Sequence, residues 1–94
     1  MIATQFIIRN SENAVIKATL YITPYTVPNT TGSNIVVGNS VKDVIGGANI
    51  DPIINLIAAP YSVRIVGGNY NTEFNIDLTL APTGSVVNAA NYIV

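Results

Sequence analysis

Apolar and polar positions alternate with a period of two along several stretches of the chain, which is the pattern of half-buried β-strands. In the clearest stretch, residues 70–80, Tyr, Thr, Phe, Ile and Leu at even positions alternate with Asn, Glu, Asp and Thr at odd positions. Residues 2–9 and 14–23 alternate in the same way, and no long stretch repeats at helical spacing. The pattern predicts strands that bury one face each.

The first two predicted strands form a hairpin whose register follows from their faces. Pairing Ile8 with Ile16 and Phe6 with Ala18 sets apolar side chains opposite one another. Residues 11–13 then form the loop, and the asparagine at its end can take the left-handed conformation. A shift of one residue would bring a lysine opposite the phenylalanine, so this register is favoured.

A second hairpin is predicted from residues 61–66 and 70–80, with Gly67 and Gly68 as a two-residue turn. This turn matches apolar positions on the two strands. It pairs Ile65 with Tyr70, Val63 with Thr72 and Tyr61 with Phe74.

The rest of the chain is divided by prolines and glycines. Residues 25–34 read as a surface loop, 35–37 as a short strand and 86–94 as a last strand. Residues 40–43 have capping-box character and could open one helical turn. Asp51 and Pro52 could do the same, although we favour a buried strand over residues 53–57. Six to seven short strands predict a single antiparallel β-sandwich of immunoglobulin-like type over residues 1–94.

Composition supports an all-β chain and narrows its partners. Fourteen Ile, 11 Val and 9 Thr make more than a third of the 94 residues β-branched. Charged residues make up 10% and the formal net charge is −1, so there is no basic footprint for nucleic acid. Such a surface is either covered by neighbouring subunits or kept soluble by the 12 Asn together with Thr and Ser.

Histidine and cysteine are both absent, which excludes disulfides, thiolate metal ligands and the commonest catalytic base. The chain enters a strand at Ile2 without the segments of a signal peptide, and its apolar runs are too short to span a membrane. We therefore expect cytoplasmic synthesis and no membrane partner.

Candidate catalytic and metal sites are weak. Glu73 and Asp77 share a strand face, but four residues of strand separate them by about 13 Å, too far for a glycosidase pair. The triplets at residues 49–51 and 75–77 both read Asn-Ile-Asp, whose oxygens could suit calcium, but they lack the loop and glycine of a calcium site. We expect no enzyme activity, no metal and no cofactor. The tyrosines fit a core or an interface better than a sugar-binding platform.

The segment PYSVRIVGGNY at residues 60–70 resembles the strand-turn-strand signature of carboxypeptidase-regulatory-like and other prealbumin-like sandwiches. Residues 13–20 resemble the second strand of the same domains, whereas the segment from Tyr25 to Asp51 departs from their pattern. Small sandwiches that are poor in charge and free of cysteine are also similar in type to the auxiliary, or decoration, proteins of bacteriophage capsids. This resemblance implies a location in the virion.

The expected function is therefore that of a virion structural protein, which binds a capsid or tail lattice through protein contacts and can form homo-oligomers. The alternative is a glycan-binding or adhesive module of a bacterial surface protein. Two apolar segments are candidates for the interface, one in the proline-bounded loop and one at the C-terminus: Tyr25, Val27 and Pro28, and Tyr92, Ile93 and Val94.

Overall fold

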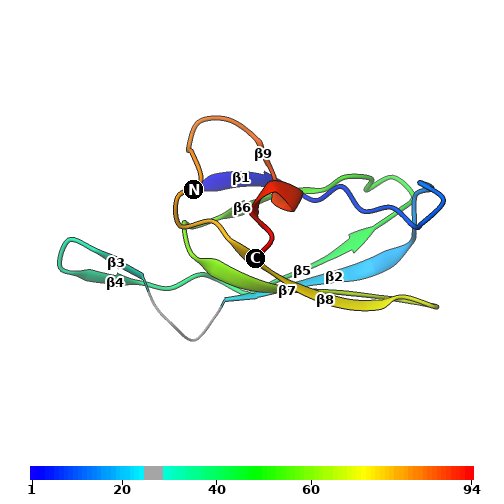
Figure 1. Cartoon of the computed structure of the whole chain (residues 1–94), viewed down its shortest axis with the longest axis horizontal. Helices are drawn as coiled ribbons and strands as arrows, with labels where there is room; N and C mark the ends of the chain where they lie inside the picture. The colour runs from blue at the N-terminus through cyan, green and yellow to red at the C-terminus, as the bar shows by residue number, and fades with distance from the viewer. Residues whose placement is uncertain (25–28) are drawn as a thin grey trace.

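Two β-sheets pack face to face in the computed structural model, which describes residues 1–24 and 29–94 (Figure 1). One sheet has three strands in the order β6-β1-β9, and the other has four in the order β5-β2-β7-β8. A separate two-stranded sheet, β3-β4, projects from one end of the sandwich. The strands are β1 (Ile2–Gln5), β2 (Ala18–Pro24), β3 (Asn29–Thr31), β4 (Asn34–Val36), β5 (Val41–Ile45), β6 (Ile53–Leu56), β7 (Pro60–Gly67), β8 (Asn71–Asp77) and β9 (Val87–Asn88).

The all-β sandwich expected from the sequence is confirmed. Its core lies between the two sheets, because each strand turns its apolar positions inward. Leu20 and Val63 on the four-stranded sheet face Ile2 and Leu56 on the three-stranded sheet, and each is at most 1% exposed. Thr4 is the polar residue in this core, and its hydroxyl donates to the carbonyl of Ile2. The core therefore buries no unsatisfied side-chain polar atom among the described residues.

The predicted first hairpin has the expected turn but not the expected ladder. Arg9 and Val15 form a bridge in the predicted register, and Asn13 has the left-handed φ of 61°. However, Phe6 and Ala18 are not paired, because β1 joins β6 and β9 while β2 joins β5 and β7. The chain crosses from one layer to the other just after the turn.

The second hairpin is present, with a register two residues away from the predicted one. Gly67 pairs with Tyr70, so the turn residues are 68 and 69, and Tyr61 lies opposite Ile76. A shift of two leaves every side chain on its expected face, so alternation could not separate the two registers. In the observed register, Tyr61 and Ile76 are both completely buried beside one another.

Three other expectations about local structure are wrong. Residues 40–43 do not form a helical turn, because Val41–Ile45 extend as β5 and pair with β2. Part of the expected surface loop is strand β3, paired with β4. The expected last strand is β9 followed by a 3-10 helix, η1 (Ala89–Tyr92), because the side chain of Asn88 accepts from the N–H of Ala90 and begins the helical turn.

The strand over residues 53–57 is confirmed as β6. Asp51 precedes it with a φ of 56°, so the Asp-Pro pair leads into a strand and not into a helix. Within residues 1–24 and 29–94, no helix is long and apolar enough to cross a membrane.

Candidate functional site

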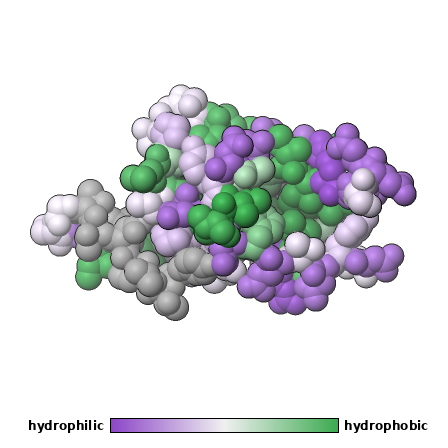
Figure 2. All heavy atoms as spheres, in the orientation of Figure 1, coloured by the Kyte–Doolittle hydropathy of each residue, from purple (hydrophilic) through white to green (hydrophobic). Residues whose placement is uncertain are grey.

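Large apolar side chains are exposed around the C-terminus. Ile93 is 52% exposed, Val94 is 76% exposed and Leu80 is 94% exposed, and these three residues line one shallow hollow with Tyr92. We refer to Leu80, Tyr92, Ile93 and Val94 as the C-terminal patch. Figure 2 shows apolar atoms gathered at the centre of this face, where the chain ends in Figure 1. Two of the residues expected at an interface, Ile93 and Val94, are thus accessible, and Tyr92 is half-buried.

Backbone contacts with β8 hold the C-terminal patch in place. Val94 N–H donates to the carbonyl of Asn75 at 3.0 Å, and Ile93 bridges to Ile76. These contacts order the last residues against the edge of the four-stranded sheet while their side chains stay accessible. The patch is therefore a defined surface and not a frayed chain end.

The other interface residues expected from the sequence, Tyr25, Val27 and Pro28, lie outside the described residues. Leu80 was not expected in a site, because in the sequence it only continues the alternation of the strand. In the structure β8 ends at Asp77, so Leu80 follows the strand and its side chain is free of the core.

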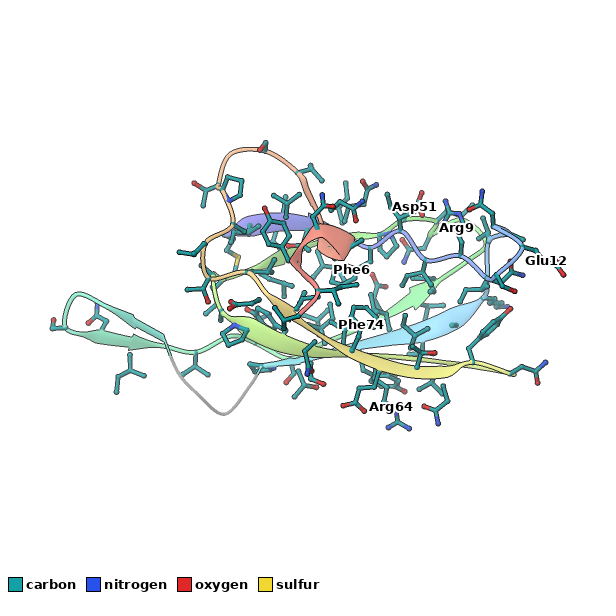
Figure 3. All side chains as sticks on the ribbon, viewed as in Figure 1. Phe6, Arg9, Glu12, Asp51, Arg64 and Phe74 are labelled. Atoms are coloured by element: carbon teal, nitrogen blue, oxygen red, sulfur yellow. The ribbon has the colours of Figure 1, made fainter. Side chains whose placement is uncertain are left out.

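An apolar groove opens between the two layers beside β8. Phe6, Ile7 and Ile8 line it from the segment after β1, with Arg9 at one end, and Phe74 and Ile93 line it from the opposite side. Phe6 and Phe74 lie between the layers in Figure 3. A second hollow, which shares Ile8 and Arg9 with the groove, lies nearer the β7–β8 turn and has a mixed lining that includes Ile65, Tyr70 and Asn10. The sandwich is therefore less fully closed along β8 than at its centre.

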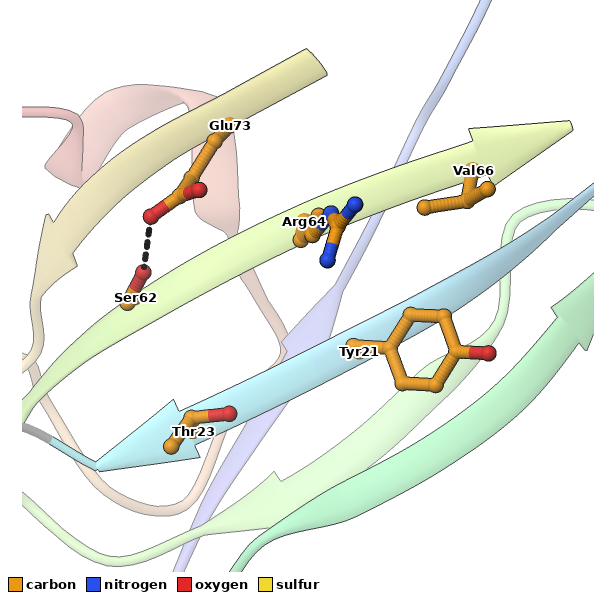
Figure 4. Close-up of a pocket in the computed structure, with 6 residues that line it drawn as sticks. All are labelled: Tyr21, Thr23, Ser62, Arg64, Val66 and Glu73. Atoms are coloured by element: carbon orange, nitrogen blue, oxygen red, sulfur yellow. Dashed lines mark hydrogen bonds between the residues drawn. The ribbon is translucent and has the colours of Figure 1, made fainter. Parts of the chain in front are cut away.

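The outer face of the four-stranded sheet carries a row of polar and charged side chains. Lys42, Tyr21, Arg64 and Glu73 lie directly opposite one another on four neighbouring strands. The Lys42 ammonium is 5.7 Å from the centre of the Tyr21 ring, a cation–π distance. Figure 4 shows the shallow hollow in this face and the hydrogen bond between Ser62 and Glu73, which measures 3.1 Å.

Arg9 and Asp51 form an ion pair that the sequence did not indicate. The guanidinium of Arg9 donates to both carboxylate oxygens of Asp51 at 2.7 and 3.0 Å. The hydrogen bonds from Arg9, more than its charge, lower the pKa of Asp51, and the same bonds raise the pKa of Arg9. Figure 3 shows both residues on the layer that contains β1. The pair joins two connections that are 42 residues apart in the sequence.

The carboxylates considered for catalysis have separate partners. Glu73 accepts from the hydroxyl of Ser62, whereas Asp77 accepts from the hydroxyl and N–H of Thr79, which together lower its pKa. Of the residues considered for calcium, Asp51 is paired with Arg9, and Asn49 donates to Asp43. Over the described part of the chain, no three acidic side chains are grouped as a metal site.

Comparison with known proteins adds no relative. No family model matches the chain, and no curated protein and no solved structure matches it significantly. The resemblance to prealbumin-like sandwiches therefore stays a prediction.

Proposed function

We propose that this protein is a structural subunit that docks on a protein lattice, in the manner of an auxiliary or decoration protein on a bacteriophage capsid or tail. The observation that carries the proposal is the C-terminal patch, where Leu80, Ile93 and Val94 expose their side chains together. Contiguous exposed apolar surface with a polar surround is typical of protein interfaces. The low charge of the chain also supports the proposal, because a surface with few charges is less soluble when exposed and favours being covered by another subunit.

In this proposal the protein docks by burying the C-terminal patch against the lattice protein. Ile93 and Val94 are held by β8, so little side-chain or backbone freedom is lost when they are covered. Leu80 extends the same surface from the segment after β8. The virion is the proposed location, and a major capsid or tail protein is the proposed partner.

The test is sedimentation of the full chain with virus particles released from the cells that encode it. Particles should contain the chain at a fixed stoichiometry, measured by quantitative mass spectrometry of gradient fractions. Leu80→Ser combined with Val94→Ser should abolish binding to particles stripped of the native chain. Ile53→Ser, which changes an exposed residue on β6, is the matched control and should bind normally. Absence of the chain from all particle fractions would contradict the proposal.

A second candidate function, glycan binding, rests on the outer face of the four-stranded sheet. The ring of Tyr21 is 37% exposed there and lies in a hollow with Ser62, Arg64 and Glu73. Sugar rings stack on aromatic side chains and form hydrogen bonds with polar groups beside them, and this hollow offers both. A glycan array with the wild-type chain and Tyr21→Ala tests it, since specific hits should disappear in the variant.

A further inference from the structure

Strand β8 has an outer edge that is paired over only part of its length. Gly67 and Tyr70 exchange hydrogen bonds at the start of the β7–β8 ladder, so the even-numbered residues of β8 point their backbone groups at β7. The odd-numbered residues point theirs to the outside. Consistent with this, the carbonyl of Asn75 accepts from Val94 on the outer side.

The outward backbone groups of Asn71 and Glu73 are left open. Across the described part of the chain, no backbone hydrogen bond outside the β7–β8 ladder involves either residue. Both residues are also exposed to solvent. This half of β8 therefore offers N–H and C=O groups at the spacing that one further strand requires.

On the opposite edge of the same sheet, side chains cover the outward backbone groups of one residue. On β5, the N–H of Val44 donates to the carboxylate of Asp43 at 2.8 Å, and the side-chain amide of Asn49 donates to the carbonyl of Val44. Asn49 also donates to Asp43, so the two side chains form one cover over this edge. The chain therefore covers β5 at Val44 and β8 at Asn75, and over the described residues the outward backbone groups of Lys42 on β5 stay open like those of Asn71 and Glu73 on β8.

The open half of β8 lies beside the apolar groove. Phe74 lines the groove from β8 itself, and Ile7, which is 46% exposed, lines it from the other layer. The second hollow, which Thr72 and Tyr70 line, lies next to it along β8. A strand that paired with β8 would turn alternate side chains into this groove. The segment that fits is therefore one with apolar residues two positions apart.

The β3–β4 sheet and the residue that follows it, Val37, present such a pair, and we call them together the arm. Ile35 is 69% exposed and Val37 is 62% exposed, and the two residues are two positions apart. The arm projects from the end of the sandwich opposite the β7–β8 turn (Figure 1). It lies within a stretch without charged residues from Ala18 to Val41, so it lacks the charges that commonly prevent an edge from pairing.

The arm cannot fill the groove of its own chain. Val37 is four Cα–Cα steps from Val41, the first residue of β5, so the two residues lie at most about 14 Å apart. The position outside β8 lies across the whole four-stranded sheet from β5, about 19 Å away at ordinary strand spacing. An arm that pairs with β8 must therefore belong to a second copy.

We propose that β4 of one copy adds as a strand to the open edge of β8 in a second copy, with Ile35 and Val37 in its apolar groove. The contact is heterologous, because the arm and the edge are different surfaces, so copies can join in chains or rings. The inference rests on the proposed function as a structural subunit and names a second copy of the chain as one of its partners.

Two variants of the full chain remove one side of the contact each. Glu73→Pro deletes an outward N–H and leaves the ladder to β7 intact, with Glu73→Ala as its matched control because both lose the bond to Ser62. Ile35→Ser combined with Val37→Ser removes the apolar pair of the arm. Sedimentation velocity over a wide concentration range should show that wild type and Glu73→Ala associate beyond the 9.9 kDa monomer. Each disrupting variant should weaken association at least about tenfold.

An equimolar mixture of the two disrupting variants gives the sharpest readout. The Glu73→Pro copy keeps its arm and the Ile35→Ser/Val37→Ser copy keeps its edge, so the mixture should form a heterodimer and nothing larger. Circular dichroism of each variant alone checks that it is folded.

A wild-type chain that is monomeric at all concentrations would overturn the inference, as would a folded Glu73→Pro that associates like wild type. Ile93 lines both surfaces, but Leu80 and Val94 line the C-terminal patch alone, so particle binding by wild type and by the Leu80→Ser/Val94→Ser variant, measured in parallel, separates the two proposals. A monomer that still binds particles refutes strand addition and leaves the proposed function in place.

Discussion

The two edges of the four-stranded sheet differ in which of their outward backbone groups are covered. At β5, side chains of the chain itself occupy the outward backbone groups of Val44, near the end of the strand. At β8, the C-terminus covers the edge near Asn75, and the backbone of Asn71 and Glu73 stays open. The difference teaches that edge protection in this fold is local, because two side chains cover one residue of β5 and the backbone of the C-terminus covers one residue of β8.

The two halves of β8 also differ in burial. The second half carries Ile76, which is completely buried, whereas Thr72 in the first half is exposed. The open edge is thus part of a strand whose other end is fixed firmly in the core.

The largest expected effect comes from truncating Ile76, whose buried side chain fixes this end of β8 in the core. Ile76→Ala should lower the free energy of unfolding by about 2 to 5 kcal/mol, because it leaves a cavity between the sheets. Thr72→Ala, on the same strand, should change it by at most about 0.5 kcal/mol. Urea unfolding followed by circular dichroism measures both, and equal losses would contradict the division of β8 into two halves.

A smaller effect is expected where β5 ends. Gly46 has a φ of 101°, and a Cβ there would lie 2.8 Å from the carbonyl of Ile16. Gly46→Ala should therefore destabilise the fold by about 2 to 4 kcal/mol through strain and overlap. Gly68→Ala, in the turn before β8, is the control, since a Cβ there meets nothing within 4 Å. Thermal unfolding should separate the two variants clearly, and similar midpoints would show that β5 can shift to accept the methyl group.

Opening the β5 edge should cost less. Asn49→Ala removes the donor to Val44 and should lower the free energy of unfolding by about 1 kcal/mol. It should also lengthen the open part of the β5 edge by the carbonyl of Val44, so sedimentation should detect larger species than in wild type. Asn55→Ala, an exposed asparagine on β6, is the matched control. An Asn49→Ala chain that behaves like this control would show that Asn49 does not protect the edge.

The smallest expected effect concerns pH. Hydrogen bonds from Arg9 hold the pKa of Asp51 below its ordinary value, so the folded state binds its proton less readily than the unfolded state. The stabilisation is complete above the unfolded pKa, near 4, and is lost as pH falls through the lower folded pKa. Thermal midpoints between about pH 5 and pH 2 should therefore fall less steeply in Asp51→Asn than in wild type. Asparagine suits the positive φ at this position, so the backbone is kept. Identical slopes would show that the pair does not contribute.

Much of the fold could be predicted from local pattern. The inward positions of β2 and β7, among them Leu20 and Val63, follow directly from alternation and are buried as expected. The turn at Asn13 follows from the preference of asparagine for a left-handed φ. Alternation reports only which face a side chain takes, so it could not choose between registers two residues apart in the second hairpin.

The candidate site was predictable only in part. The apolar end of the chain is visible in the sequence, and Ile93 and Val94 are exposed as an interface requires. Leu80, the ion pair of Arg9 with Asp51 and the open edge of β8 were not predictable. Each depends on which segments, distant in sequence, come to lie beside one another.

By itself, the sequence determined that this protein is an all-β chain, which positions face its core and where several turns occur, because β-branched composition and a period of two act locally. Only the tertiary structure decided which strands became neighbours. It placed β1 and β2 in different layers, covered Val44 on one sheet edge with Asp43 and Asn49, and left half of β8 open. Strand pairing is non-local, since any edge with matching faces can pair, and the packing of both layers around one core selects among the alternatives.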